Sequence, residues 1–446
     1  MKHKIDVVVM GGGVAGLSAA YHIKKKYPNS QVVVYEKSGE WGGLCGGFYV
    51  DSPRGKFWFD NAVHLSFTGD KYVQDFFQNS SEPYRHIPNP ENYYQNIWLK
   101  HPAQNNLYAL PVDTKVKAIR DMLQNSNKKE NIKNFAEWLK VQYGNFFAEN
   151  FSFAYTRKYW TAEAEDLSVN PVFVGPRFYI PNTEEILFGA MSEDTPVTYY
   201  AKEMRYPKEG QYRSFFKDLM EGIEITYNKE VIEIDPKNKE IICQDGTKTQ
   251  YNKLVSTLPL PLMANLIVDA PQHIKEQASN LHATSAALVS FGFGSADIPK
   301  NLWFYVYDED KLFARVYSPS CKSPSNAPDG CSSLQAEIYF SKLKPLESMI
   351  GEQKDIPNYL ISHVKEKFVE MGICKSSDIV CEDFRILPFG NVIFTHGMEE
   401  SREVVLNFVE SKDILTCGRF GEWDYLWSDQ SFLSGMKVAE RIKGLK

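Results

Sequence analysis

The chain has 446 residues, a formal net charge of −6, and a large aromatic complement of 28 Phe, 25 Tyr and 8 Trp. This length is enough for two or three domains or one large two-domain enzyme, and the negative charge gives no reason to expect a nucleic-acid partner. Since no apolar stretch reaches the ~18 residues of a membrane-spanning helix, and residues 5–10 are too short for a secretory signal, we expect neither a transmembrane segment nor secretion.

A strand, a glycine-rich turn and a helix are predicted at the start of the chain. Residues 5–10 are mostly apolar and mostly β-branched, and Gly11, Gly13 and Gly16 then satisfy G-x-G-x-x-G before a helical pattern over residues 15–26. The first glycine makes the tight turn, the second lets a pyrophosphate approach the backbone, and the third lets the helix pack on the strand. Free N–H groups at the helix start favour phosphates.

The second predicted strand carries an acidic residue at its end. Residues 31–35 are mostly apolar, and Glu36 follows about 20 residues after the last glycine, where a carboxylate accepts hydrogen bonds from a ribose 2′-hydroxyl. The pattern therefore predicts a dinucleotide site, and the alternative is an ordinary βαβ unit.

A second glycine cluster follows closely. Glu36-Lys37 and then Gly42-Gly43-Leu44 form the pattern E-K-x-x-x-x-G-G-L, which brings another loop near the same dinucleotide. This pattern resembles the second fingerprint of FAD enzymes in the amine oxidase and UDP-galactopyranose mutase superfamily. The resemblance implies FAD, rather than NAD, as the cofactor.

Residues 57–67, FWFDNAVHLSF, are predicted as a strand and a loop. The matching stretch of UDP-galactopyranose mutases has Asp, two glycines and His, and the resemblance implies that His64 lies over the reactive face of the flavin. Asp60 matches as well, but Ala62 and Val63 replace the glycines, so we expect a stiffer loop. The alternative is a loop histidine satisfied by backbone groups.

The next segment is predicted to be largely helical. Apolar residues at helical spacing indicate helices over residues 71–79, 114–125 and 132–147, and residues 98–112 are predicted as a strand pair. Asp113 stands where the mutases have a Gln that helps to hold the nucleotide.

Residues 155–177 resemble a mutase segment that borders the nucleotide site. Six positions match it: Tyr155, Lys158, Trp160, Leu167, Ser168 and Arg177. The resemblance implies that Arg177, on a mobile loop, binds the substrate diphosphate, because a planar guanidinium binds two oxygens at once. It also implies substrate contacts for Tyr155 and Trp160. The alternatives are core packing for Trp160 and a surface ion pair for Arg177.

A three-strand meander is predicted in the middle of the chain. Residues 214–220 are expected to form a helix, residues 231–234, 240–243 and 247–251 the meander, and residues 253–257 a return strand. Asp-Gly at one turn is a strong hairpin signal, and glutathione-reductase-type FAD domains use such a crossover. Val231 is predicted to touch the adenine, or else to be a core residue of the sheet.

Residues 302–339 closely resemble the eukaryotic-type mutases. Trp303, Tyr305, Arg315, Pro324, Asn326 and Pro328 fall in register with their pattern. The resemblance implies that Arg315 is the second diphosphate arginine, and the alternative is a partly buried structural ion pair. Lys322 stands where the mutases have a substrate-contacting Tyr, and a lysine can still meet a phosphate. Asn391 stands in place of another mutase tyrosine.

The C-terminal stretch closes the predicted site. A strand over residues 414–417 ends at Gly418-Arg419, and an amphipathic helix follows over residues 432–443. Glycine between a strand and a helix repeats the arrangement that favours anions. By resemblance, Gly418 and Arg419 lie near the ribityl and pyrophosphate groups, and Tyr425 is a tyrosine that the mutases share.

These motifs predict an α/β fold, with a glutathione-reductase-type, Rossmann-like FAD-binding domain, a mixed-sheet substrate domain and a helical cap. The FAD-binding domain is expected from residues 1–65, 205–260 and 405–446, the substrate and cap part from residues 66–204, and the substrate domain from residues 261–404. FAD is expected to contact Gly11, Gly13, Val14, Ala15, Gly16, Glu36, Lys37, Gly43, Leu44, Val231, Gly418, Arg419, Asp429, Gln430 and Ser431. Catalysis is assigned to His64, Arg177, Arg315 and Tyr425, and substrate binding to Tyr155, Trp160 and Lys322.

Three functions fit these motifs. The first is a mutase-like isomerase, in which reduced flavin acts as a nucleophile on a nucleotide sugar and an external reductant such as NAD(P)H supplies the electrons. The second is an FAD-dependent oxidoreductase of the amine oxidase or desaturase type, and the third is a catalytically silent flavin-binding protein. The seven cysteines form no C-x-x-C pair and have no histidine at zinc spacing, so we expect no metal site and a cytoplasmic protein. The sequence leaves the oligomeric state open.

Overall fold

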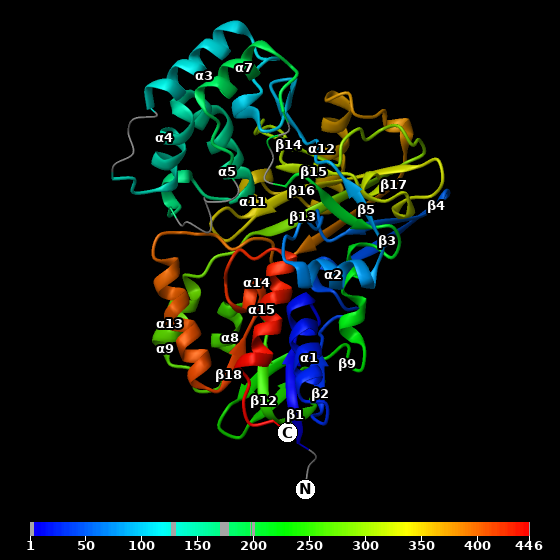
Figure 1. Ribbon diagram of the computed structural model, residues 1–446, viewed down its shortest axis with the longest axis vertical. Coiled ribbons are helices and arrows are strands. Elements are labelled where there is room, and N and C mark those ends of the chain that lie inside the picture. Colours follow the sequence, from blue (N-terminus) through cyan, green and yellow to red (C-terminus); the bar gives the residue numbers. More distant parts are fainter. Residues whose placement is uncertain (1–3, 126–130, 170–177, 197, 199–200, 446) are drawn as a thin grey trace.

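A computed structural model describes residues 4–125, 131–169, 178–196, 198 and 201–445. Its elements form two sheet-based halves and a helical cap (Figure 1). The lower half combines the start, a central stretch and the end of the chain, drawn in blue, green and red, and both termini lie at its base. The upper half holds a second sheet with the cap beside it.

The lower sheet is built around a parallel core. Within the described residues seven strands join it, in the order β10-β11-β12-β1-β2-β9, with β18 also paired to β12. Their bounds are β1 Ile5–Met10, β2 Val32–Tyr35, β9 Glu224–Thr226, β10 Val231–Asp235, β11 Glu240–Cys243, β12 Lys248–Ser256 and β18 Ile414–Thr416. Val7 and Val9 of β1 pack with Ala19 of helix α1 (Val14–Lys26) and Val438 of helix α15 (Ser428–Arg441). The apolar run at the start of the chain is therefore a central strand buried on both faces.

Strand β12 joins the meander to the parallel core. The sequence predicted two strands here, but residues 248–256 form one, because the pairing passes without a break from β11 at Gln250 to β1 at Tyr251. The first part of β12 pairs antiparallel with β11, and its second part lies parallel to β1 and β18.

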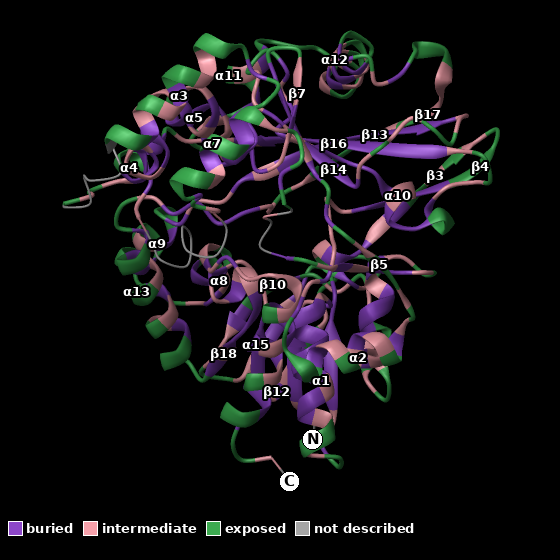
Figure 2. Cartoon of the chain, turned by 45° about the horizontal axis from the view of Figure 1, so that its top comes forward, coloured by how far each residue is buried: buried purple, intermediate pink, exposed green. Residues whose placement is uncertain are grey.

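The upper sheet is mixed. Seven strands of the described chain form it in the order β17-β13-β16-β15-β14-β6-β7. β14 runs parallel to β6, and the other neighbours are antiparallel. Figure 2 shows β13 and β16 buried beneath helix α12 (Ile356–Glu370), which inserts Leu360, Val364 and Phe368 into the core. The bounds are β6 Glu91–Tyr94, β7 Ile97–Lys100, β13 Ser285–Phe293, β14 Trp303–Val306, β15 Arg315–Tyr317, β16 Ser332–Phe340 and β17 Ile379–Leu387.

The cap is helical, with one departure from the predicted elements. Its helices are α3 Val112–Asn125, α4 Phe135–Phe147, α5 Phe153–Tyr159 and α7 Thr183–Met191. The strand pair predicted over residues 98–112 is wrong, because β7 ends at Lys100 and a 3₁₀ turn follows at Ala103–Asn105. Pro102 lacks the N–H group that a continuing strand would need.

The remaining elements connect these layers. They are β3 Gly47–Ser52, β4 Gly55–Asp60, α2 Lys71–Ser80, β5 Pro83–His86, β8 Met204–Pro207, α8 Leu260–Leu266, α9 Gln272–Ser279, α10 Pro319–Lys322, α11 Leu346–Ile350, α13 Met398–Ser411 and α14 Gly418–Gly421. The helix predicted over residues 214–220 is a 3₁₀ helix over Tyr212–Met220. In the described part of the chain, no helix combines the length and the apolar character needed to cross a membrane.

Candidate active site

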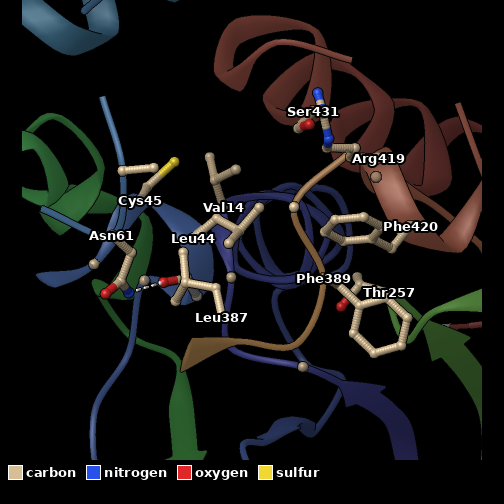
Figure 3. A pocket seen from close by; sticks show the side chains of 18 of the residues that line it. Val14, Leu44, Cys45, Asn61, Thr257, Leu387, Phe389, Arg419, Phe420 and Ser431 are labelled. Atoms are coloured by element: carbon tan, nitrogen blue, oxygen red, sulfur yellow. Dashed lines mark hydrogen bonds between the residues drawn. The ribbon is translucent and has the colours of Figure 1, made fainter. Parts of the chain in front are cut away.

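A cavity of about 1120 Å³ lies between the two halves of the molecule. Figure 3 shows Val14, Leu44 and Cys45 on one wall, with Phe389, Phe420 and Thr257 on the opposite wall. Its lining includes the turn after β1, the loop after β4, and residues of β13 to β17 in the upper sheet. Segments that are far apart in the sequence therefore meet around one space.

The glycine-rich turn forms one end of the cavity. Gly11 has a φ of +105°, a conformation that favours glycine, and it leads directly into the start of α1. A Cβ atom on Gly16 would lie 2.0 Å from the carbonyl oxygen of Gly11, so only glycine lets the helix pack this close. At Gly13, by contrast, the nearest described atom to such a Cβ would be Gly43 Cα at 3.9 Å. Backbone N–H groups are thus open to a diphosphate here.

Glu36 lies at the end of β2 and lines the same end. One carboxylate oxygen accepts from the Gly12 N–H at 2.6 Å, and the other accepts from the Ser38 N–H at 2.8 Å. These bonds orient a carboxylate that retains lone pairs for ribose hydroxyls. Lys37 and Val231 also line this region.

The second glycine cluster lies against the first. The Gly42 N–H donates to Gly12 O at 2.9 Å, and the Asn61 side chain donates to Gly43 O at 3.0 Å (Figure 3). Leu44 lines the cavity beside this contact. The two motifs therefore form a single cradle, with the shape that a dinucleotide such as FAD needs.

The C-terminal stretch forms the next wall. Gly418 has a φ of +83°, and a Cβ atom there would meet Ala15 Cβ at 2.5 Å. Helix α15 presents Asp429 and Ser431 of its first turn to the cavity, whereas Gln430 caps the helix by accepting from the Trp427 N–H at 2.8 Å. Gln430 is not part of the cavity lining.

Arg419 lines the cavity but is held by protein groups. Its guanidinium donates to Leu426 O at 2.8 Å and to Asn391 Oδ1 at 2.7 Å, and its Cζ lies 3.9 Å from the ring centre of Tyr425. These contacts orient the arginine across the wall of the cavity, and they leave it less free to follow a ligand.

His64 lies on the loop that follows β4. Its Nδ1 lies 3.1 Å from Ala62 O, so this nitrogen carries the proton, and its ring lines the cavity. The pKa of His64 is lowered to about 4, mainly by burial. The positive charge of Lys322 also lowers it, whereas the negative charge of Asp60 acts in the opposite direction. The side chain is therefore both satisfied by the backbone and presented to the cavity as a neutral imidazole.

Arg315 enters the cavity from β15. Its Nε donates to Glu337 Oε2 at 2.7 Å, and its Nη2 lies 3.2 Å from the Tyr339 hydroxyl. Burial disfavours the charged form most strongly of any single cause, but Glu337 and the neighbouring tyrosines together outweigh it and raise the pKa of Arg315 well above its usual value. The arginine side chain is 16% exposed and the Glu337 side chain is 0% exposed, so it is the cation that faces the cavity.

A pair of tyrosines completes this part of the cavity. The hydroxyls of Tyr159 and Tyr425 are 2.9 Å apart, and Tyr159 Oη lies 3.4 Å from Asn391 Oδ1. The sequence motifs predicted Tyr425 but missed Tyr159, Tyr339 and Glu337. The only local signal was the alternation along β16, which places Glu337 and Tyr339 on one face.

Several predicted site residues lie outside the cavity lining. Tyr155 stacks on Tyr159 with ring centres 5.3 Å apart, and Trp160 packs edge-on against the same ring at 5.0 Å, so both lie one layer behind. Lys322 is fully buried, with its Nζ 2.5 Å from Asp60 Oδ2. Arg177 lies outside the described residues.

Comparisons with known proteins place the chain in a protein family. The model of a protein family described as flavin containing amine oxidoreductase matches residues 14–370. Coproporphyrinogen III oxidase of Bacillus subtilis (strain 168) is 20% identical over 397 residues, which cover 81% of this chain and 83% of that protein. The enzyme of the same name from Staphylococcus aureus is 22% identical and covers 82% and 84%.

Solved structures extend the likeness to the whole fold. A crystal structure of reduced UDP-galactopyranose mutase superposes with a TM-score of 0.88 and 21% identity, covering 98% of this chain and 95% of that one. The predicted α/β, Rossmann-like fold is thereby confirmed.

Proposed function

Since the chain belongs to the flavin containing amine oxidoreductase family, and is therefore a flavoenzyme with FAD as its cofactor, we propose that it interconverts the pyranose and furanose forms of a nucleotide sugar. The observation that carries this proposal is the position of Arg315. A permanently charged guanidinium faces the cavity from β15, and its counter-charge Glu337 is covered by protein. Such a site suits a diphosphate better than a cationic amine.

Different residues along the cavity would bind the cofactor and stabilise the leaving group. Gly11, Gly13 and Glu36 would hold the dinucleotide, and His64 would lie at the end where the loop after β4 meets the helix start of α15. Reduced FAD, when bound, would supply the nucleophile for the anomeric carbon. Arg315 would stabilise the negative charge that grows on the nucleoside diphosphate as its bond to the sugar breaks.

The tyrosines would orient the sugar. Tyr159 and Tyr425 share a hydrogen bond at 2.9 Å, and each hydroxyl can also bond to a sugar hydroxyl. Aromatic side chains of the cavity lining, among them Tyr159, Tyr305 and Tyr339, would keep water away from the anomeric carbon, where it would otherwise hydrolyse the bond to the sugar.

The first test is anaerobic turnover. The holoenzyme is reduced with dithionite, UDP-galactopyranose is added, and the nucleotide sugars are separated by chromatography. We expect a new furanose peak that appears with reduced enzyme and is absent with oxidised enzyme. Absence of that peak, together with a flavin spectrum that neither UDP nor the sugar nucleotide perturbs, would reject the proposal for this substrate.

Replacing Arg315 tests the diphosphate contact. We expect Arg315→Ala to weaken UDP binding at least about tenfold, because a charge-assisted hydrogen bond contributes about 1.5–3 kcal/mol. UDP titration followed by flavin absorbance measures this change. The matched control is Arg120→Ala, whose exposed ion pair with Asp121 lies on the cap helix α3 and should leave the affinity unchanged.

A second candidate is an oxidoreductase in which the flavin accepts a hydride. The relatives named coproporphyrinogen III oxidase favour it at 20–22% identity. Such an enzyme would reduce its flavin when given substrate without dithionite, and would consume oxygen during turnover. Flavin bleaching by a panel of amines and reduced tetrapyrroles, insensitive to UDP, would establish this alternative.

A further inference from the structure

Glu337 lies at the centre of β16 and is fully buried. It lies opposite Arg315 in the register of β15 and β16. A carboxylate in such a position is costly unless its oxygens are well bonded. Both of its oxygens are bonded, and they face different parts of the site.

One oxygen serves the arginine side. Oε2 accepts from Arg315 Nε at 2.7 Å and from the Tyr339 hydroxyl at 2.7 Å. Tyr339 Oη in turn lies 3.2 Å from Arg315 Nη2. The guanidinium is thus held along one edge, and its plane is set by two neighbours.

The other oxygen serves the loop that carries His64. Oε1 accepts from the Val63 N–H at 2.9 Å. Val63 follows Ala62, whose φ of +70° is unusual for a residue with a side chain, and it precedes His64. A single side chain therefore bonds the loop beside the predicted flavin and the arginine beside the predicted diphosphate.

We propose that Glu337 is a positioning residue that couples Arg315 to the loop over residues 61–64. An anion that binds the Arg315 guanidinium would change the hydrogen bond between Arg315 and Glu337 Oε2. The same carboxylate would pass this change to its hydrogen bond with the Val63 N–H. Ligand binding at the arginine would then be sensed at the flavin. This inference rests on the proposed function for the identity of the anion, whereas the loop contact is independent of it.

The test compares Glu337→Gln and Glu337→Asp with the wild-type holoenzyme. The amide keeps the shape but removes the charge, and the aspartate keeps the charge but is one methylene too short to reach both partners. The visible flavin spectrum is recorded first without ligand and then during titration with UDP, and turnover of the reduced enzyme is measured. The control is Glu382→Gln on β17 of the same sheet, which breaks a partly exposed ion pair with Lys365 of α12.

We expect both Glu337 variants to bind UDP within about fivefold of the wild type, while kcat falls at least tenfold. We also expect a changed ligand-free flavin spectrum and a smaller UDP-induced shift, and neither change in Glu382→Gln. Equal spectra and equal kcat would overturn the proposal. If one variant fails to fold, the other decides the outcome.

Failure of the proposed function is distinguishable from failure of this inference. If the wild type binds no UDP, the proposed function fails, and the ligand-free spectra then decide the role of Glu337. A changed ligand-free spectrum supports the loop contact, and an unchanged one rejects it.

Discussion

At the scale of single residues, burial and backbone hydrogen bonds determine the charge state of His64 and the position of its loop. His64 is a neutral imidazole because its surroundings disfavour a charge, and its loop is held in place by the Val63 N–H bond to Glu337 at 2.9 Å. Two predictions belong at this scale.

The first prediction concerns pH. The pKa of His64 is about 4 in the folded chain and 6.5 in an unfolded chain, so the unfolded chain binds the proton more tightly. Its stability contribution is present above pH 6.5 and is lost as the pH falls toward 4. Between pH 7 and pH 5 the free energy of unfolding of the wild type should fall because His64 takes up a proton on unfolding. We expect this fall to be smaller in His64→Gln, by up to about 2 kcal/mol. Urea unfolding at both pH values measures this, with His396→Gln on the exposed surface as control.

The second prediction concerns the backbone of the same loop. Ala62 has a φ of +70°, where a Cβ atom costs about 1–2 kcal/mol and glycine costs little. We expect Ala62→Gly to raise the free energy of unfolding by about 0.5–1 kcal/mol, after the greater flexibility of glycine in the unfolded chain is subtracted. Chemical denaturation of the holoenzyme measures the change. A loss of stability would show that Ala62 makes contacts that outweigh the strain.

At the scale of elements, the close contact of α1 with α15 brings two helix starts to one end of the cavity. Gly435 of α15 makes this possible, since a Cβ atom there would lie 2.2 Å from Ala15 O and 2.9 Å from the Ala19 N. Both partners are backbone atoms of α1, which cannot move aside without moving the glycine-rich turn.

We therefore expect Gly435→Ala to separate the two helices and to release FAD. The variant should lose at least about 2 kcal/mol of stability by overpacking, and its flavin content should fall. Thermal unfolding and the ratio of flavin absorbance to protein absorbance provide the readout. Gly69→Ala is the control because no described atom lies within 4 Å of the Cβ position there. Full flavin content in Gly435→Ala would contradict this account.

At the scale of the whole molecule, a buried polar cluster holds together three of the elements that connect the layers. Asp60, at the end of β4, pairs with Lys322 Nζ at 2.5 Å and accepts from the Tyr206 hydroxyl at 3.0 Å and the Trp58 indole at 2.8 Å. Trp58 and Asp60 belong to β4, Tyr206 to β8 and Lys322 to α10, and the loop that carries His64 follows Asp60 directly in the chain.

We expect Lys322→Met to cost about 3–5 kcal/mol, because it leaves a buried carboxylate without its counter-charge. The double variant Asp60→Asn with Lys322→Met should recover part of that loss. Urea unfolding gives the stabilities, and UDP titration tests the role that the resemblance implied for Lys322. A stable variant with weakened UDP binding would show instead that Lys322 contacts the substrate.

The sequence by itself determined the opening β1-α1-β2 unit, the glycine turns and the acidic end of β2, because each depends on residues that are close together in the chain. Gly11 to Glu36 needed only local spacing to predict a dinucleotide site. The tertiary structure alone decided that Lys322 is a buried partner of Asp60, that Tyr159 faces Tyr425, and that Glu337 bonds Arg315 and Val63. These contacts join segments up to 274 residues apart, and no periodicity or motif encodes which distant side chains meet. Which distant side chains come into contact is determined by how the two sheets and their connecting elements pack around the cavity.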